Sequence, residues 1–217
     1  MSIHVFLADD HAVVRDGLRF LLEAQPDIRV IGDAADGRAA VRLVEQLCPD
    51  VVLIDIAMPE LNGIEATGQI RAACPATQVV ILSMHSTAEH IIRALQAGAL
   101  GYLLKESAGA EVAIAVRAAH AGRRYLSRRI AETMPEVLTR LTDESHIKSP
   151  LERLSPRERE VLQLVVEGQS SAAIADTLAL SPKTVETYRS RLMQKLGIGD
   201  LPTLVKFAVE HGLTPGA

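Results

Sequence analysis

The sequence predicts two folded units: an α/β unit built on a doubly wound, five-stranded parallel sheet, and an all-α unit of four helices. Short β-branched apolar runs alternate with longer stretches of helical periodicity through the first 121 residues. This alternation is typical of a parallel sheet covered by helices. From residue 151 onward the strand pattern stops and helix-start signals follow one another. A chain of 217 residues is long enough to bury two such cores.

Five apolar runs predict the strands, and five periodic stretches predict the helices of the first unit. The first, third and fourth runs are almost entirely apolar, as expected of strands that helices cover on both faces. Proline or glycine follows each periodic stretch and ends a helix there. The predicted strands are 3–8, 28–34, 51–54, 78–83 and 101–104, and the predicted helices are 11–25, 37–48, 61–73, 87–97 and 109–121.

The second unit is predicted from its helix caps. Ser155, Pro156 and Glu158 have the spacing of an N-cap, a first-turn proline and a capping-box glutamate. Ser181 and Pro182 open a later helix in the same way. The predicted helices are 156–167, 170–179, 182–196 and 201–211.

Between the two units lies a linker in which we expect one helix. It carries apolar residues at helical spacing, and Pro135 implies that this helix is kinked or begins there. These apolar residues are Ile130, Met134, Leu138 and Leu141. The division is therefore a first unit at 1–121, a linker at 122–150 and a second unit at 151–217.

Composition narrows the class of protein. The net charge is −4, and the acidic residues are concentrated in the first half of the chain. Cys48 and Cys74 have no metal-ligand spacing, and we interpret them as buried or incidental free thiols of a reducing compartment. The start lacks a basic leader, and no apolar window reaches the roughly 18 residues of a membrane span. We expect a soluble cytoplasmic protein without a membrane partner.

Polar residues stand where the predicted strands end. Asp9 and Asp10 follow the first strand, Asp55 the third, Ser83 ends the fourth and Lys105 follows the fifth. In a doubly wound sheet these ends meet at the ligand-binding edge. Three carboxylates close together repel one another and need a cation to stay ionised. Mg²⁺ fits because it takes few carboxylates together with waters or phosphate oxygens.

Each of these residues also has an ordinary interpretation. An aspartate after a strand is often only a helix cap, and Asp10 or Asp36 fits that role. Ser83 or Lys105 alone would be a solvated loop residue. The ordinary interpretation does not explain why such residues end four different strands.

Residues 1–121 resemble a response-regulator receiver domain, on the motifs DD at 9–10, DIAMP at 55–59, LS at 82–83, GY at 101–102 and LLK at 103–105. The resemblance implies that Asp55 accepts a phosphoryl group from the phosphohistidine of a sensor histidine kinase. It implies Mg²⁺ ligation by Asp10, Asp55 and the backbone carbonyl of Ala57, with Asp9 binding directly or through water.

The resemblance also implies a role for three further residues. Lys105 would neutralise charge on the phosphoryl group, and Ser83 would follow the acyl phosphate. Tyr102 would repack behind it as a switch. An ordinary core tyrosine remains the alternative for Tyr102.

The predicted helix 182–196 has an apolar side and a polar side. Val185, Tyr188 and Leu192 fall on the core side, while Lys183 and Thr187 fall on the other. Its four basic residues outnumber one glutamate, as expected of a helix that lies against phosphates. A charged face alone is usually just solvated, but the short helix and tight turn before it predict a helix-turn-helix.

The stretches LSPREREVLQLV and IADTLALSPKTVETYRSRLMQKLGI resemble LuxR-type DNA-binding domains, and the whole chain resembles a NarL/FixJ-type response regulator. The resemblance implies binding to double-stranded DNA, with Glu186, Thr187 and Ser190 facing bases; the helical wheel adds Lys183. It also implies a homodimer on DNA, because paired recognition helices read paired half-sites. The candidate phosphate contacts are Lys183, Arg189, Arg191 and Lys195.

Three functions stay open from the sequence. The first is a transcription factor whose DNA binding depends on Asp55 phosphorylation. The second is a Mg²⁺-dependent phosphatase or phosphotransferase using the same aspartates, although Ala57 stands where a second catalytic acid is needed. The third is a regulator that binds DNA independently of phosphate, with the first unit serving only for dimerisation.

Overall fold

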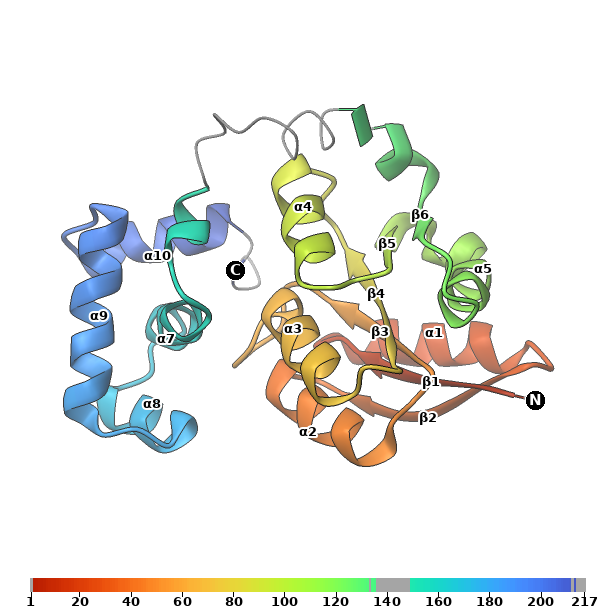
Figure 1. Ribbon diagram of the computed structural model, residues 1–217, viewed down its shortest axis with the longest axis horizontal. Helices are drawn as coiled ribbons and strands as arrows, with labels where there is room; N and C mark the ends of the chain where they lie inside the picture. The colour runs from red at the N-terminus through yellow and green to blue at the C-terminus, as the bar shows by residue number, and fades with distance from the viewer. Residues whose placement is uncertain (1, 133, 136–148, 212, 214–217) are drawn as a thin grey trace.

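The computed structural model describes residues 2–132, 134–135, 149–211 and 213. A sheet with helices on both faces forms the first part, and a helical unit lies beside it (Figure 1). The strands are β1 (Ile3–Ala8), β2 (Ile28–Ala34), β3 (Val51–Asp55), β4 (Gln78–Ser83), β5 (Gly101–Leu104) and β6 (Tyr125–Leu126). Their order in the sheet is β2-β1-β3-β4-β5-β6, and every neighbouring pair is parallel.

The sheet separates two hydrophobic layers. On one face lie α1 (Ala12–Glu23) and α5 (Ala108–His120), and on the other lie α2 (Gly37–Leu47), α3 (Gly63–Ala73) and α4 (Ala88–Gln96). Strand β3 serves both layers, because Leu53 packs into the α1/α5 side and Ile54 into the other. Successive side chains of a strand point to opposite faces, which explains why this strand is apolar throughout.

The parallel doubly wound sheet is confirmed, but the predicted number of strands is wrong: the sheet has six strands rather than five. Strand β6 pairs with the outer edge of β5, through Gly101 with Tyr125 and Tyr102 with Leu126. Two residues are too few to show an alternation of apolar and polar positions, so no strand is predicted here from the pattern alone.

The helical unit contains a short 3-10 turn, η2 (Pro150–Arg153), and the four helices α7 (Pro156–Val166), α8 (Ser171–Leu178), α9 (Pro182–Leu196) and α10 (Leu201–Glu210). The predicted capping box is confirmed: Ser155 and Glu158 bond to each other's backbone N–H. Ser181 caps α9 by accepting a bond from the N–H of Thr184. Leu162, Ile174 and Leu192 are among the fully buried residues of this unit's core.

The linker prediction can be followed only in part. Residues 128–132 are helical, and Ile130 is fully buried in the layer under α2, α3 and α4. Leu138 and Leu141 lie outside the described residues. Within the described part of the chain, none of the helices has the length and apolar character needed to span a bilayer.

Candidate functional site

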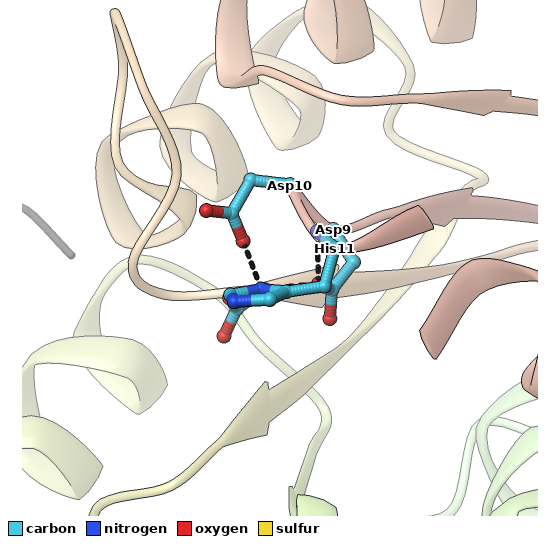
Figure 2. A group of neighbouring side chains, drawn as sticks. Asp9, Asp10 and His11 are labelled. Atoms are coloured by element: carbon cyan, nitrogen blue, oxygen red, sulfur yellow. Dashed lines mark hydrogen bonds and ion pairs between the residues drawn. The ribbon is translucent and has the colours of Figure 1, made fainter. Parts of the chain in front are cut away.

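Three aspartates meet at the carboxyl ends of β1 and β3, where the strand order reverses. Asp9, Asp10 and Asp55 each offer a carboxylate oxygen, and His11 a ring nitrogen, with these atoms all within 4.8 Å of one another. Figure 2 shows the Asp10 carboxylate directed at the His11 ring, with Oδ1 of Asp10 2.6 Å from Nδ1 of His11. The sequence pattern predicts the three aspartates at this edge but not His11, although His11 directly follows Asp10 in the chain.

Asp55 is buried at the tip of its strand, beside the other candidate phosphoryl-transfer groups. It is the last residue of β3 and only 3% exposed. The pKa of Asp55 is raised to about 6, chiefly by burial; Lys105 opposes the rise, and the charges of Asp9 and Asp10 add to it. A carboxylate in this position has few waters to displace before it can attack an electrophile.

Lys105 binds two of the carboxylates at once. Its Nζ lies 2.8 Å from Oδ2 of Asp9 and 2.8 Å from Oδ2 of Asp55. Burial lowers the pKa of Lys105, but the charge of Asp55 and the hydrogen bonds to Asp55 and Asp9 outweigh this and raise it. The lysine therefore stays charged and holds the Asp55 side chain in place.

One cavity joins the candidate residues of three strands. It has a volume of about 260 Å³, and Asp55, Ala57, Ser83 and Lys105 line it together with His11, Ile56, Met84 and His85. Ser83 is buried, and its hydroxyl accepts a bond from the N–H of His85 at 2.9 Å. The hydroxyl, the ammonium and the carboxylate thus face a common space large enough for a phosphoryl group.

Tyr102 is not among the residues that line this cavity, but it contacts one of them, His85. It is fully buried, and its hydroxyl donates to the backbone carbonyl of His85 at 2.8 Å. Burial raises its pKa well above the ordinary value. Because Ser83 binds the N–H of the same His85, a shift of the β4 end would reach Tyr102 directly.

The loop after β3 is built by close backbone contacts. Asn62 caps α3 by accepting bonds from the N–H groups of Ile64 and Glu65. A Cβ on Gly63 would lie 1.9 Å from the carbonyl oxygen of Asp55, so only glycine fits there. The start of α3 is therefore packed directly against the backbone of Asp55.

The carboxylates also satisfy the requirements of a metal site. Three carboxylates against one lysine leave an excess of negative charge, which a divalent cation would balance. Oxygen donors of this kind suit a hard cation. The acidic cluster can therefore hold a metal ion.

The exposed face of α9 is a second candidate surface. Lys183, Glu186, Thr187, Ser190 and Arg191 are all exposed. A hollow of about 370 Å³ runs along this face, lined by Ser181, Lys183, Thr184, Thr187, Tyr188 and Arg191.

Two basic residues of α9 turn away from that hollow and bind their own unit. Lys195 lies 2.7 Å from Oε2 of the capping-box glutamate Glu158. Arg189 donates to Ser171 at 3.1 Å and lies 3.5 Å from Glu186. A helical wheel of α9 can show the pair of Arg189 with Glu186, three residues apart, but not the bonds to Glu158 and Ser171, because these belong to neighbouring helices.

The two units also bind each other, through a contact that the sequence pattern does not predict. Gln163 of α7 is fully buried, and its side chain binds the backbone N–H of Asn62 at 2.7 Å and the carbonyl of Met58 at 2.8 Å. Glu167 accepts a bond from the N–H of Glu60 at 3.0 Å. These bonds hold the loop that follows Asp55.

Charged pairs extend this contact along α3. Arg159 of α7 makes two bonds to the carboxylate of Glu65, at 2.6 and 3.1 Å. Gln69 and Arg38 both donate to Glu160. Figure 1 shows α7 on the side of the helical unit that faces the sheet and α9 on the outer side. The sequence signal for the contact is weak: a glutamine inside the apolar run of α7.

Comparison with known proteins agrees with both halves of this structure. Residues 5–117 match the response regulator receiver domain, and residues 152–208 match the bacterial regulatory proteins of the luxR family. The transcriptional regulatory protein LiaR of Bacillus subtilis is 42% identical, over 97% of this chain and 99% of its own length.

Solved structures of a response regulator match this chain over nearly its whole length. The response regulator RcsB of Salmonella typhimurium is 26% identical with a TM-score of 0.67, over 98% of each chain. A structure of two RcsB dimers bound to two parallel DNAs is 26% identical with a TM-score of 0.60, over 96% of this chain and 98% of that one. The chain therefore belongs to the two-component response regulators of the NarL and LuxR type, transcription regulators that join a receiver domain to a LuxR-type DNA-binding domain.

Proposed function

We propose that this chain is a transcription factor whose DNA binding is controlled by phosphorylation of Asp55 by a sensor histidine kinase. The observation that carries the proposal is the position of Asp55: buried at a strand tip, bound by Lys105 and flanked by two further carboxylates. In the reaction a carboxylate oxygen attacks phosphorus, and the bond from phosphorus to the kinase histidine breaks. The transfer needs alignment and charge neutralisation more than covalent help.

The cofactor in this proposal is Mg²⁺. Asp10, Asp55 and the backbone carbonyl of Ala57 would hold it, with Asp9 binding directly or through water. When bound, the ion neutralises charge on the transferring oxygens. Lys105 holds Asp55 for the attack and supplies the second positive charge.

The proposed switch runs from Ser83 to Tyr102. Ser83 binds an oxygen of the acyl phosphate and in doing so gives up or alters its bond to the N–H of His85. Tyr102 holds the carbonyl of the same residue and repacks with it.

Coupling to the DNA-binding domain would follow the loop after β3. Gln163 and Glu167 bind this loop directly, so a movement at Asp55 alters the contact that orients α7. We assign residues 1–121 to the receiver, 122–150 to the linker and 151–217 to the DNA-binding domain. Because α9 lies on the outer side, phosphorylation would act on domain placement and dimerisation rather than by uncovering α9.

The DNA surface is proposed on the exposed face of α9. Glu186, Thr187 and Ser190 face bases, together with Lys183, which also reaches phosphate. Arg191 is a phosphate contact on the same hollow, and Arg189 and Lys195 join it when their ion pairs with Glu186 and Glu158 exchange for phosphate. A homodimer on two half-sites is supported by the DNA-bound dimers of RcsB. DNA and a histidine kinase as partners support a cytoplasmic location.

DNA binding of wild type and Asp55→Asn, with and without acetyl phosphate, tests this function. The probe is duplex DNA selected from a random pool by the phosphodonor-treated wild type. We expect the donor to tighten wild-type binding about 5- to 150-fold, the usual range of an allosteric coupling, and to leave the variant unchanged. Asp16→Asn, the same substitution at an exposed position of α1, serves as a matched control. Equal enhancement of DNA binding in Asp55→Asn would overturn the proposal. DNA binding that acetyl phosphate does not change in any of the three proteins would also contradict it and would favour phosphate-independent regulation.

A further inference from the structure

The only two cysteines of the chain lie side by side, although they are 26 positions apart in the sequence. Their Sγ atoms are 3.6 Å apart. Cys48 is the C-cap of α2 and Cys74 the C-cap of α3, and a proline follows each. The pair lies at the amino ends of β3 and β4, the opposite edge of the sheet from Asp55.

Backbone contacts, rather than the thiols, bring the two cysteines together. The N–H of Cys48 binds the carbonyl of Val44 at 2.8 Å, and the N–H of Cys74 binds that of Ile70 at 2.7 Å. The Thr77 hydroxyl donates to the carbonyl of Pro49 at 2.7 Å and ties the two turns to each other. The sulfur atoms are therefore held in contact by the fold, and a movement of about 1.5 Å would bring them to bonding distance.

The two thiols differ in accessibility. Cys48 is exposed and Cys74 is 7% exposed. Burial raises the pKa of the Cys74 thiol, and the neighbouring Cys48 raises it further. An oxidant from solvent therefore reaches Cys48 first, and Cys74 stands behind it as a second thiol.

We propose that Cys48 and Cys74 form a reversible, peroxide-oxidised dithiol site. The Cys48 thiolate attacks a peroxide oxygen, the O–O bond breaks, and Cys48 becomes a sulfenic acid with release of water after protonation. The Cys74 sulfur then attacks the Cys48 sulfur, the sulfenic hydroxide leaves with the Cys74 proton as water, and the disulfide forms. A dithiol reductant restores both thiols by exchange.

The ring that this disulfide closes contains β3, Asp55, the loop bound by Gln163 and all of α3. Oxidation would therefore restrain the segment that carries the phosphoryl-transfer site and the contact with α7. The proposal does not depend on phosphorylation, because its chemistry involves neither Asp55 nor the acidic cluster.

The test uses the reduced full-length protein treated with hydrogen peroxide in slight excess. We expect a monomer whose mass is lower by two hydrogens, both thiols lost to maleimide labelling under denaturing conditions, and full recovery with dithiothreitol. We also expect the oxidised protein to melt several degrees higher than the reduced one, because the crosslink restricts the unfolded chain. None of these readouts depends on phosphorylation of Asp55. Failure of the dithiol proposal can therefore be distinguished from failure of the proposed function.

Two single variants separate the roles of the thiols. Cys74→Ser should accumulate a sulfenic acid at Cys48 that dimedone traps. Cys48→Ser, a change at an exposed position, should lose its remaining thiol at least about tenfold more slowly because Cys74 is shielded. Two titratable thiols after oxidation of the wild type, or disulfides found only between molecules, would overturn the proposal. If Cys74→Ser lacks the circular dichroism spectrum of the folded wild type, Cys74→Ala replaces it.

Discussion

Gln163 of α7 and Asn62 at the start of α3 form a buried hydrogen bond between the two domains, with the Gln163 side-chain oxygen 2.7 Å from the Asn62 backbone nitrogen. The same glutamine donates to the carbonyl of Met58 at 2.8 Å. Asn62 also caps the helix that packs against Asp55. One side chain of the DNA-binding domain is thus bonded to the loop that frames the proposed phosphoryl-transfer site.

Replacing Gln163 by alanine should loosen the contact between the domains. The change leaves the buried N–H of Asn62 and the carbonyl of Met58 without partners, at a cost of about 1–3 kcal/mol each unless water enters. We expect a larger radius of gyration by small-angle X-ray scattering. Gln194→Ala, at an exposed position of α9, is the control. Identical scattering from both variants and the wild type would count against this contact in solution.

Adding one methyl group at Gly63 should damage the phosphoryl-transfer site. The new Cβ would lie 1.9 Å from the carbonyl oxygen of Asp55, so the strand tip or the helix start must move. We expect Gly63→Ala to lose phosphoryl uptake and to unfold at lower temperature. Gly68→Ala, in the same helix with no atom within 4 Å of its Cβ, should instead gain up to about 1 kcal/mol of stability. Normal uptake by Gly63→Ala would show that the close approach is relaxed in solution.

Lys105→Met should slow phosphoryl uptake from acetyl phosphate by about a hundredfold or more. The variant keeps an unbranched side chain, one atom shorter, but removes the charge that lies 2.8 Å from both Asp55 and Asp9. Uptake rates by intact mass at saturating Mg²⁺ provide the measurement. Lys206→Met, on an exposed part of α10, should react like the wild type. A rate within a fewfold of wild type for Lys105→Met would remove the lysine from the reaction.

His90 should make the protein less stable in mild acid. Its Nε2 donates to the carbonyl of His211, and its Nδ1 accepts from Thr87. The pKa of His90 is lowered from 6.5 to about 4, chiefly by burial and also by His85 and Arg93, while Glu89 and the bond to His211 oppose the change. As the pH falls, His90 is therefore protonated in the unfolded chain before it is protonated in the folded protein. The free energy of unfolding is intact above about pH 6.5 and falls by up to roughly 3 kcal/mol as the pH drops toward 4.

Urea unfolding of wild type and His90→Gln between pH 4 and 7 measures this effect. The other titrating groups are common to both proteins, so the difference between the two curves isolates the histidine. Below pH 6.5, we expect the free energy of unfolding of the wild type to fall steadily relative to that of His90→Gln. Parallel curves would contradict a buried neutral His90.

Arg191→Ala should weaken DNA binding by a similar factor on every sequence. A phosphate contact adds affinity without base preference, so its loss should also reduce the slope of log K against log salt by about 1. Binding isotherms at several salt concentrations give the slope, with Lys206→Ala as the matched loss of a charge elsewhere. A change confined to particular base pairs would instead assign Arg191 to base recognition.

The fold was largely predictable because hydrophobic periodicity and helix caps are local signals. The acidic cluster was predictable too, since parallel strands bring residues distant in sequence, such as Asp9 and Asp55, to one edge. Strand β6 was missed because pairing with β5, rather than its own two residues, makes it a strand.

Contacts between elements could not be predicted from local signals. The sequence pattern predicts that Lys195 faces DNA. In the structure α7 lies beside α9, and Lys195 binds Glu158 of α7. In the sequence Gln163 is only one polar residue in an apolar run. Its role becomes visible when the loop after β3 lies against it and Asn62 binds its side chain. Cys48 and Cys74 likewise look unrelated until α2 and α3 are packed together.

The measurement that tests the central claim most directly is the intact mass of the protein after incubation with acetyl phosphate, with and without Mg²⁺, for wild type and Asp55→Asn. The account predicts one metal-dependent phosphoryl adduct on the wild type and none on the variant. An adduct of equal yield on Asp55→Asn, or no adduct on the wild type over a time course from seconds to hours, would contradict it.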